Sequence, residues 1–184
     1  MAIEEPQYTV ESKALHYEIR KYGPVVVAET KIESDFENVG NQAFKILAGY
    51  IFGANKSKTK IAMTASVNQE AVSEKIEMTA PVTQTKGTSG FLVQFTMPKK
   101  YTLKTLPVPD DSRVQLRQLP ARKVAVYTYS GSWSESRYAE KLTKFNLELK
   151  SDKVETFGEP LLARYNSPFQ ILFLRRNEIW LEVK

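Results

Sequence analysis

One pattern that occurs in both halves of the chain constrains the fold more than any other sequence feature. In the first half, residues 15–22 alternate between apolar and polar side chains, a Gly-Pro pair follows, and residues 25–30 form a more apolar run. In the second half, residues 114–119 alternate, a proline interrupts, and residues 123–130 continue. Successive side chains of a strand point to opposite faces, so this alternation predicts half-buried strands. The sequence therefore predicts two copies of one strand-turn-strand unit.

A helix is predicted after each copy. Ser34 is followed by Glu37, and Ser132 by Glu135, which is the Ser-x-x-Glu spacing of a capping box at a helix start. Apolar residues then recur at helical spacing in both halves. The matching residues lie about 98 positions apart, and they are Phe44 with Leu142, Leu47 with Phe145, and Ile51 with Leu149. Strands, caps and apolar stripes thus agree in register, which indicates an internal repeat.

Further strands are expected after each helix, at residues 91–97 in the first half and at residues 160–165 and 179–183 in the second. The predicted fold class is α+β, with two β-α-β-β pseudo-repeats whose strands form one antiparallel sheet or a distorted antiparallel β-barrel. Two helices would flank this sheet.

The length of 184 residues fits a single domain that spans residues 1–184. Its repeated halves would cover about residues 8–98 and 113–184, joined by a proline-containing and acidic linker at about residues 99–112. The seam between two such halves is a common place for a ligand.

An eight-residue phrase also occurs twice, as KIAMTASV at residues 60–67 and as KIEMTAPV at residues 75–82. If both copies are strands, each places Ile, Met, Ala and Val on one face. Two interpretations follow, an ordinary apolar core or the lining of a binding site that contains Met63 and Met78. Core packing is the simpler of the two.

Composition excludes several classes of function. The chain has no cysteine and one histidine, so disulfides, thiolate metal sites and Ser-His-Asp or Cys-His catalysis are not expected. The net charge of +5 comes from a mixed-charge surface with short basic clusters, which does not favour nucleic-acid binding. The acidic N-terminal residues do not have the pattern of a signal peptide, and no apolar run predicts a membrane span. We therefore expect a cytoplasmic protein without these catalytic sets.

Three segments carry a resemblance to a known family. YEIRKYGPVVVAE at residues 17–29, the doubled phrase, and YNSPFQILFLRRNEIWLEV at residues 165–183 together resemble the SOUL/heme-binding protein family, in particular its plant- and bacterial-type members. The match runs from about residue 8 to the C-terminus. The resemblance implies a fold of two β-α-β-β repeats and non-covalent binding of heme or a related tetrapyrrole, in a carrier, buffer or sensor without catalytic activity. Protein partners are not predicted.

The resemblance also suggests a site. Vertebrate SOUL proteins have been proposed to use a histidine as axial ligand, but the matching position here is Lys21, so that ligand does not carry over. The only histidine, His16, is the remaining candidate metal ligand. An apolar cleft beside the first helix is expected instead to hold heme, with Lys45 pairing with a propionate. The residues predicted to form it are Phe44, Lys45, Leu47, Ile51, Phe169 and Leu172.

Alternatives from other functional classes remain. The family fold is similar to effector-binding domains of multidrug-response regulators, so the chain could bind lipophilic cations, and this would require an acidic residue deep in the seam. A protein-interaction module and a hydrolase built on a seam glutamate and tyrosine are further alternatives.

Overall fold

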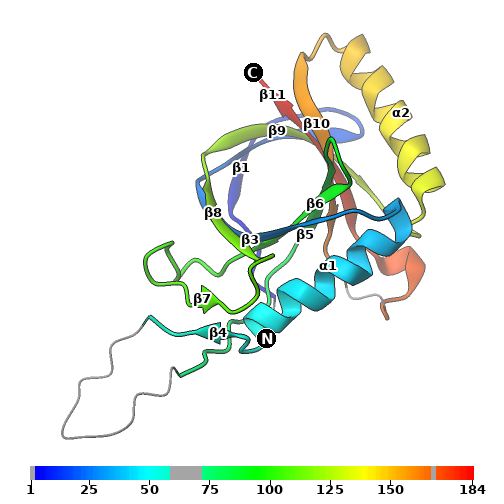
Figure 1. Cartoon of the computed structure of the whole chain (residues 1–184). Coiled ribbons are helices and arrows are strands. Elements are labelled where there is room, and N and C mark those ends of the chain that lie inside the picture. The colour runs from blue at the N-terminus through cyan, green and yellow to red at the C-terminus, as the bar shows by residue number, and fades with distance from the viewer. Residues whose placement is uncertain (1–2, 59–71, 167–168) are drawn as a thin grey trace, which may run out of the picture.

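The computed structural model describes residues 3–58, 72–166 and 169–184, which form one curled antiparallel sheet with two helices beside it (Figure 1). The helices are α1 (Phe36–Ile51) and α2 (Glu135–Ser151), and a short 3-10 turn, η1 (Leu172–Leu174), precedes the last strand. The strands of the large sheet are β1 (Tyr8–Lys13), β2 (Tyr17–Tyr22), β3 (Val25–Ile32), β5 (Val82–Lys86), β6 (Phe91–Thr96), β8 (Gln115–Leu119), β9 (Arg122–Tyr129), β10 (Thr156–Arg164) and β11 (Asn177–Val183). A separate pair consists of β4 (Asn55–Lys56) and β7 (Val108–Pro109).

The strand order follows the internal repeat. Across the nine-stranded sheet the order is β1-β2-β9-β11-β10-β5-β6-β3-β8, and every neighbouring pair is antiparallel. Without β1, this order is symmetric. When the strands of the first half, β2, β3, β5 and β6, are matched in turn with those of the second half, β8, β9, β10 and β11, the order is the same from either end. The predicted α+β class with one large antiparallel sheet and two helices is therefore confirmed, and the two halves pair at three places, β2 with β9, β3 with β8 and β5 with β10.

The predicted barrel is not closed. The strands curve into a near-complete ring (Figure 1), but β1 and β8 are the two ends of the sheet and do not pair with each other. β1 contains a register shift between Val10 and Ser12, and all of its residues are exposed. Bulges and exposed polar side chains are features that keep edge strands from pairing further. The sheet is therefore an open, curled sheet.

Both helices begin one or two residues away from the predicted capping boxes. Asp35, not Ser34, caps α1, since its carboxylate accepts hydrogen bonds from the backbone amides of Glu37 (3.1 Å) and Asn38 (2.9 Å). Ser134, not Ser132, is the N-cap of α2 and makes no side-chain cap hydrogen bond. The predicted helices are thus correct, whereas the predicted caps are wrong.

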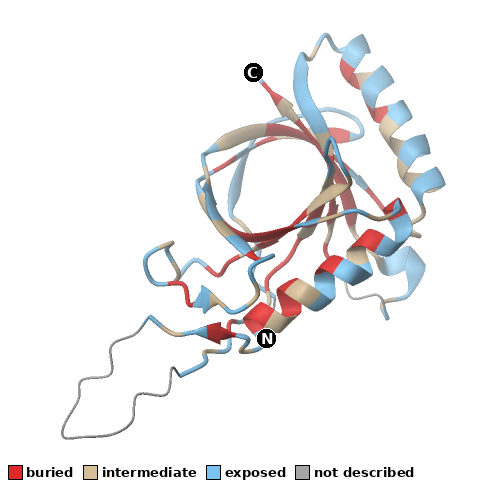
Figure 2. Ribbon diagram, in the orientation of Figure 1, coloured by how far each residue is buried: buried red, intermediate tan, exposed pale blue. Residues whose placement is uncertain are grey.

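Two apolar cores lie between the sheet and the helices. Beneath α1, Leu47 and Ile51 pack with residues of β6 such as Val93 and Phe95. Beneath α2, Phe145 and Leu149 pack with residues of β9 and β11. Both helices keep an exposed outer side (Figure 2), and none of the described helices is long and apolar enough to span a membrane.

The second copy of the doubled phrase contributes packing more than strand structure. Its first copy, with Met63, lies outside the described residues. In the second copy, Ile76 and Ala80 are buried and Met78 packs against the α1 core, which agrees with the core interpretation. The predicted strand is wrong, because only an isolated bridge from Thr79 to Glu4 precedes β5. Pro81 lacks the amide hydrogen that a regular ladder would need there.

Candidate functional site

The structure divides the predicted helix residues between the core and the surface. Leu47 and Ile51 are 0% and 1% exposed and pack against the sheet, so they hold α1 in place and do not line an open cleft. Phe44 is 39% exposed and lies 5.7 Å from the ring of Phe95, between centroids. Lys45 is also exposed. The stripe was placed correctly on the helix, but only its outer edge faces solvent, because the side chains at i+3 and i+7 turn toward the sheet.

The predicted loop residues lie on a strongly apolar exposed segment around η1. We call this segment the apolar shelf, and its members are Phe169, Ile171, Leu172, Phe173 and Leu174, which are 95%, 57%, 51%, 71% and 54% exposed. The carbonyl of Leu172 accepts a hydrogen bond from the amide of Gly131 (3.0 Å), just before α2 begins. Soluble proteins rarely expose contiguous apolar side chains, so a patch of this kind often marks a binding surface.

Two arginines and a tryptophan connect the apolar shelf with α1. Arg175 donates a hydrogen bond to the carbonyl of Gln170 (2.9 Å), and its guanidinium carbon lies 4.3 Å from the centre of the Trp133 ring. The guanidinium carbon of Arg164 lies 5.2 Å from the same ring. Arg164 also lies against α1, because a Cβ atom added to Gly40 would come within 2.5 Å of its Nη1 atom. Since Phe44 follows Gly40 by one turn, both residues share one face of the helix.

Arg164 is a cation without an acidic partner among the described residues. Its Nη2 atom donates to Gln84 (3.0 Å), while its Nε atom is buried without a hydrogen-bond partner. The hydroxyl of Tyr129 is also buried and unpaired. Burial lowers the pKa of Arg164 to about 10 and raises the pKa of Tyr129 to about 12. A buried, uncompensated cation of this kind favours the approach of an anion.

Sequence reasoning missed Arg164, although the sequence holds a signal for it. Alternation along β10 places Arg164 on the same face as Leu162, which is fully buried in the core beneath α2. A charged side chain at a position where the pattern requires an apolar one is a candidate functional residue. Its partners Trp133 and Gly40 come from distant parts of the chain and have no local signal.

The structure separates His16 from the other predicted residues. The Nδ1 atom of His16 lies 3.0 Å from a carboxylate oxygen of Glu148, in the second half of α2. The apolar shelf contacts the chain before that helix begins, and at about 1.5 Å per residue Glu148 lies roughly 20 Å further along the helix. No group of three or more potential metal ligands of the His, Cys, Asp or Glu type occurs in the part of the chain that is described.

The concave interior of the sheet contains a buried carboxylate. Glu178 is 1% exposed and accepts hydrogen bonds from Arg20 (3.0 Å), Tyr165 (2.7 Å) and the indole of Trp180 (2.8 Å). Arg176 lies 3.7 Å away. This is the deep acidic residue that a cation-binding module requires, but its charge is already balanced by arginine. Burial and the neighbouring Glu178 charge raise the pKa of Tyr165 well above its ordinary value.

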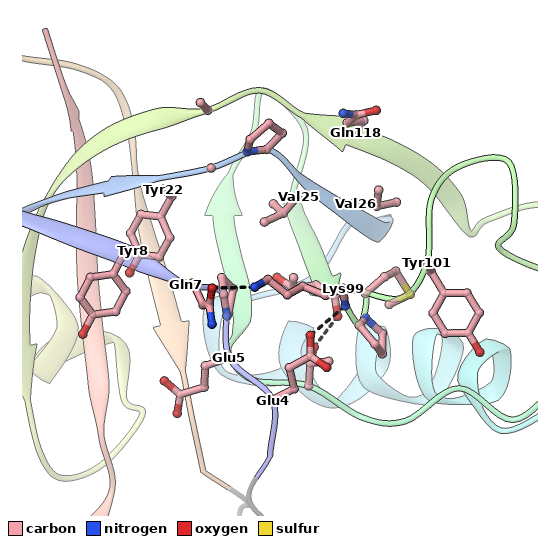
Figure 3. Close-up of a pocket in the computed structure, with 18 of the residues that line it drawn as sticks. Glu4, Glu5, Gln7, Tyr8, Tyr22, Val25, Val26, Lys99, Tyr101 and Gln118 are labelled. Carbon is pink, nitrogen blue, oxygen red and sulfur yellow. Dashed lines mark hydrogen bonds between the residues drawn. The ribbon is translucent and has the colours of Figure 1, made fainter.

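A cleft of about 1030 Å³ opens at one end of the curled sheet (Figure 3). Its walls include Tyr8, Tyr22 and Val25 on the sheet and Tyr101 on the opposite side (Figure 3). Hydrogen bonds from Lys99 cross it, from its amide to Glu4 (2.8 Å) and from its Nζ atom to Gln7 (2.6 Å). Lys21 also lines this cleft, but the predicted heme-binding residues do not.

Comparisons with known proteins identify the family. A family model described as "SOUL heme-binding protein" matches residues 3–182. The chain belongs to the SOUL heme-binding protein family. Mouse heme-binding protein 2 is 32% identical over 169 residues, which cover 90% of this chain and 77% of the mouse protein. These findings confirm the resemblance that the sequence segments carry.

Solved structures agree with the SOUL fold at low sequence identity. The C-terminal domain of EcmrR is 10% identical with a TM-score of 0.65, and the match covers 93% of this chain and 99% of that domain. A hydrolase from Listeria innocua is 11% identical with a TM-score of 0.63, and the match covers 95% of this chain and 94% of that protein. At such identities the likeness shows a shared fold alone.

Proposed function

We propose that this SOUL-family chain binds heme or a related tetrapyrrole non-covalently on the surface formed by the apolar shelf, Trp133 and the outer side of α1. The observation that carries the proposal is the position of the apolar shelf, which is exposed to solvent and connected through Trp133 to the uncompensated cation Arg164. The family membership and the mouse relative, named heme-binding protein 2, support the ligand class.

The residues of this surface fit a porphyrin chemically. A porphyrin such as heme is a flat apolar disc with carboxylates on one edge, so it needs apolar side chains for its face and cations for its acid groups. Phe44, Phe169 and Leu172 offer the first, and Lys45 and the unpaired Nε atom of Arg164 offer the second. Apolar side chains would hold the ligand by excluding water, and the arginine would orient its acidic edge.

Binding by burial does not require the histidine. His16 lies at the other end of α2 and forms an ion pair or hydrogen bond with Glu148. When bound, heme supplies its own redox and ligand-binding chemistry at iron. The chain supplies the surface and the charge, so we infer that it acts as a carrier, buffer or sensor and not as an enzyme.

A buried carboxylate that arginine already neutralises argues against the alternative of a cation-binding module. A lipophilic cation that pairs with Glu178 would have to displace Arg20, which is bound to Glu178 at 3.0 Å. It would thereby remove the buried acidic partner of Arg20, which would keep only the part-exposed Glu18 at 2.9 Å, and this is costly. We therefore favour a tetrapyrrole over a lipophilic cation as the ligand.

A hemin titration tests the proposal. The wild-type chain should give a saturable shift of the Soret band with one-to-one stoichiometry. Phe44→Asp and Leu172→Asp, which place a charge on exposed apolar positions, should weaken binding about tenfold or more, because each charge must lose water under the ligand. His16→Ala is the control and should leave the Soret spectrum unchanged. Non-saturating uptake equal to that of an unrelated basic protein would refute the proposal.

A further inference from the structure

Arg164 occupies the end of a row of polar side chains across three neighbouring strands. Tyr129 of β9 is paired with Asn177 of β11, and Asn177 is paired with Arg164 of β10. Directly opposed residues of neighbouring strands project from the same face of a sheet. The face in question carries the helices, since Tyr129 packs in the core beneath α2.

The middle of the row holds Trp133 in place. The indole of Trp133 donates a hydrogen bond to the side-chain oxygen of Asn177 (2.7 Å), and the side-chain amide nitrogen of Asn177 donates to the carbonyl of Gly131 (3.3 Å). Asn177 is fully buried. The tryptophan ring is therefore fixed beside Arg164 at one edge of the apolar shelf, and it forms one wall of the space around the guanidinium.

α1 forms the opposite wall, and it allows the arginine there only because residue 40 is glycine. The Cβ atom of any other residue at this position would lie 2.5 Å from the Nη1 atom of Arg164, closer than non-bonded atoms approach. Glycine in the middle of a helix is less favourable than alanine. At this position of α1, the side chain that benefits from the missing Cβ atom is Arg164, whose guanidinium occupies the space.

Each end of this row has a polar atom without a partner among the described residues. The Nε atom of Arg164 and the hydroxyl of Tyr129 are both buried and have no hydrogen-bond partner. Buried polar groups in folded proteins are nearly always paired, so two unpaired ones in the same row of side chains indicate a partner from outside the chain. A carboxylate matches the guanidinium best, because its oxygens accept hydrogen bonds and it carries the opposite charge.

We infer that Arg164 is the anion-recognition residue of this surface and selects tetrapyrroles that carry a free carboxylate. The inference rests on the proposed function and adds its ligand class, a flat apolar macrocycle with an acidic edge, whether or not it contains iron. Trp133 and Gly40 act as positioning residues that keep the guanidinium in place.

Two metal-free probes that share one macrocycle and differ in whether its carboxyl groups are free or methylated test the inference. Protoporphyrin IX and its dimethyl ester are titrated at one detergent concentration, and binding is followed by porphyrin fluorescence. A charge-assisted hydrogen bond contributes roughly 1.5–3 kcal/mol, so the wild-type chain should bind the acid about ten- to a hundredfold more tightly than the ester. Arg164→Gln should lower the affinity for the acid to that for the ester and leave the ester affinity unchanged.

A matched arginine is the control. Arg122 is also mostly buried and lies over a tryptophan ring, with its guanidinium carbon 5.3 Å from the centre of the Trp180 ring, but it belongs to the concave interior. Arg122→Gln removes the same charge and should retain the preference for the acid. An equal loss of preference in Arg122→Gln and Arg164→Gln would assign the effect to net charge and overturn the inference.

Gly40→Ala separates recognition from folding. Alanine should stabilise the helix or leave it unchanged, since it is the better helix former, yet it must displace the Arg164 guanidinium. We expect weaker binding of the acid, unchanged binding of the ester and an undiminished unfolding midpoint. A purely structural role for Arg164 would not give this combination.

The outcomes distinguish the inference from the proposed function. If neither hemin nor the two probes bind, the proposed function fails and the inference with it. If hemin binds while acid and ester bind equally well, or while Arg164→Gln keeps the preference for the acid, the function stands and the inference is wrong.

Discussion

The most informative stability prediction concerns the buried carboxylate of Glu178. Glu178→Gln keeps the size of the side chain but removes its charge, and it replaces one acceptor oxygen with an amide that can only donate. Three donors now point at the carboxylate, from Arg20, Tyr165 and Trp180. After the change, Arg20, which is 6% exposed, would lose its buried acidic partner and keep only Glu18, which lies 2.9 Å from its Nε atom and is 25% exposed.

The expected effect is large relative to the stability of the whole domain. Breaking a buried ion pair by removing one partner costs about 3–5 kcal/mol, against a typical total of about 5–15 kcal/mol. With a urea m-value of about 2 kcal/mol/M, the unfolding midpoint should fall by roughly 1.5–2.5 M.

Urea unfolding followed by tryptophan fluorescence and far-UV circular dichroism measures this change. Glu182→Gln is the matched control, because Glu182 lies on the same strand and its carboxylate is 3.8 Å from Arg122 but 41% exposed. Exposed pairs contribute about 0–1 kcal/mol, so this variant should shift the midpoint by about 0.5 M or less. A Glu178→Gln midpoint within that same interval of the wild type would refute the argument that the carboxylate anchors the interior.

Two further predictions concern the core and the pH dependence. Leu47→Ala should lower the free energy of unfolding by about 2–5 kcal/mol, because it leaves a cavity beneath α1, while Phe44→Ala at the exposed edge should cost clearly less; equal losses in chemical denaturation would contradict the assignment of Leu47 to the core. Burial raises the pKa of Tyr22 and of Tyr129 from 10.0 to about 12, so the folded state favours the neutral phenols. The resulting stability is present below pH 10 and is lost as the pH rises toward 12. Titration of all tyrosines together near pH 10 in the folded chain, seen by phenolate absorbance, would show that this is wrong.

Much of the fold follows from local patterns. Alternation predicted β2, β3, β8 and β9, and helical spacing predicted α1 and α2 with Leu47 and Phe145 at matching places. These patterns are visible because the burial of each side chain follows the period of its own element. The predicted caps were wrong by one or two residues, since Asp35 and Ser34 are both good cap residues and only the backbone path decides between them.

The site was predicted less well, because its parts come from distant segments. Phe44 and Leu172 were named and are exposed, while Leu47 and Ile51 were named and belong to the core. The stripe that marks a helix face does not tell which edge of that face a sheet will cover. Arg164 was missed because its neighbours Trp133 and Gly40, which come from distant segments, distinguish it from any other arginine on a strand.

What the sequence by itself determined is the repeat and, through it, the α+β class and the helices, while three sequence segments carried the resemblance to the family. These depend on the order of residues along the chain, where period and capping act over a few positions. The tertiary structure alone decided that the sheet stays open, that Glu178 is neutralised by Arg20, and that Arg164 lies between Trp133 and Gly40 without an acidic partner among the described residues. These outcomes depend on which side chains meet across strands and helices, and electrostatic and steric contacts between residues more than 30 positions apart leave no periodic trace in the sequence.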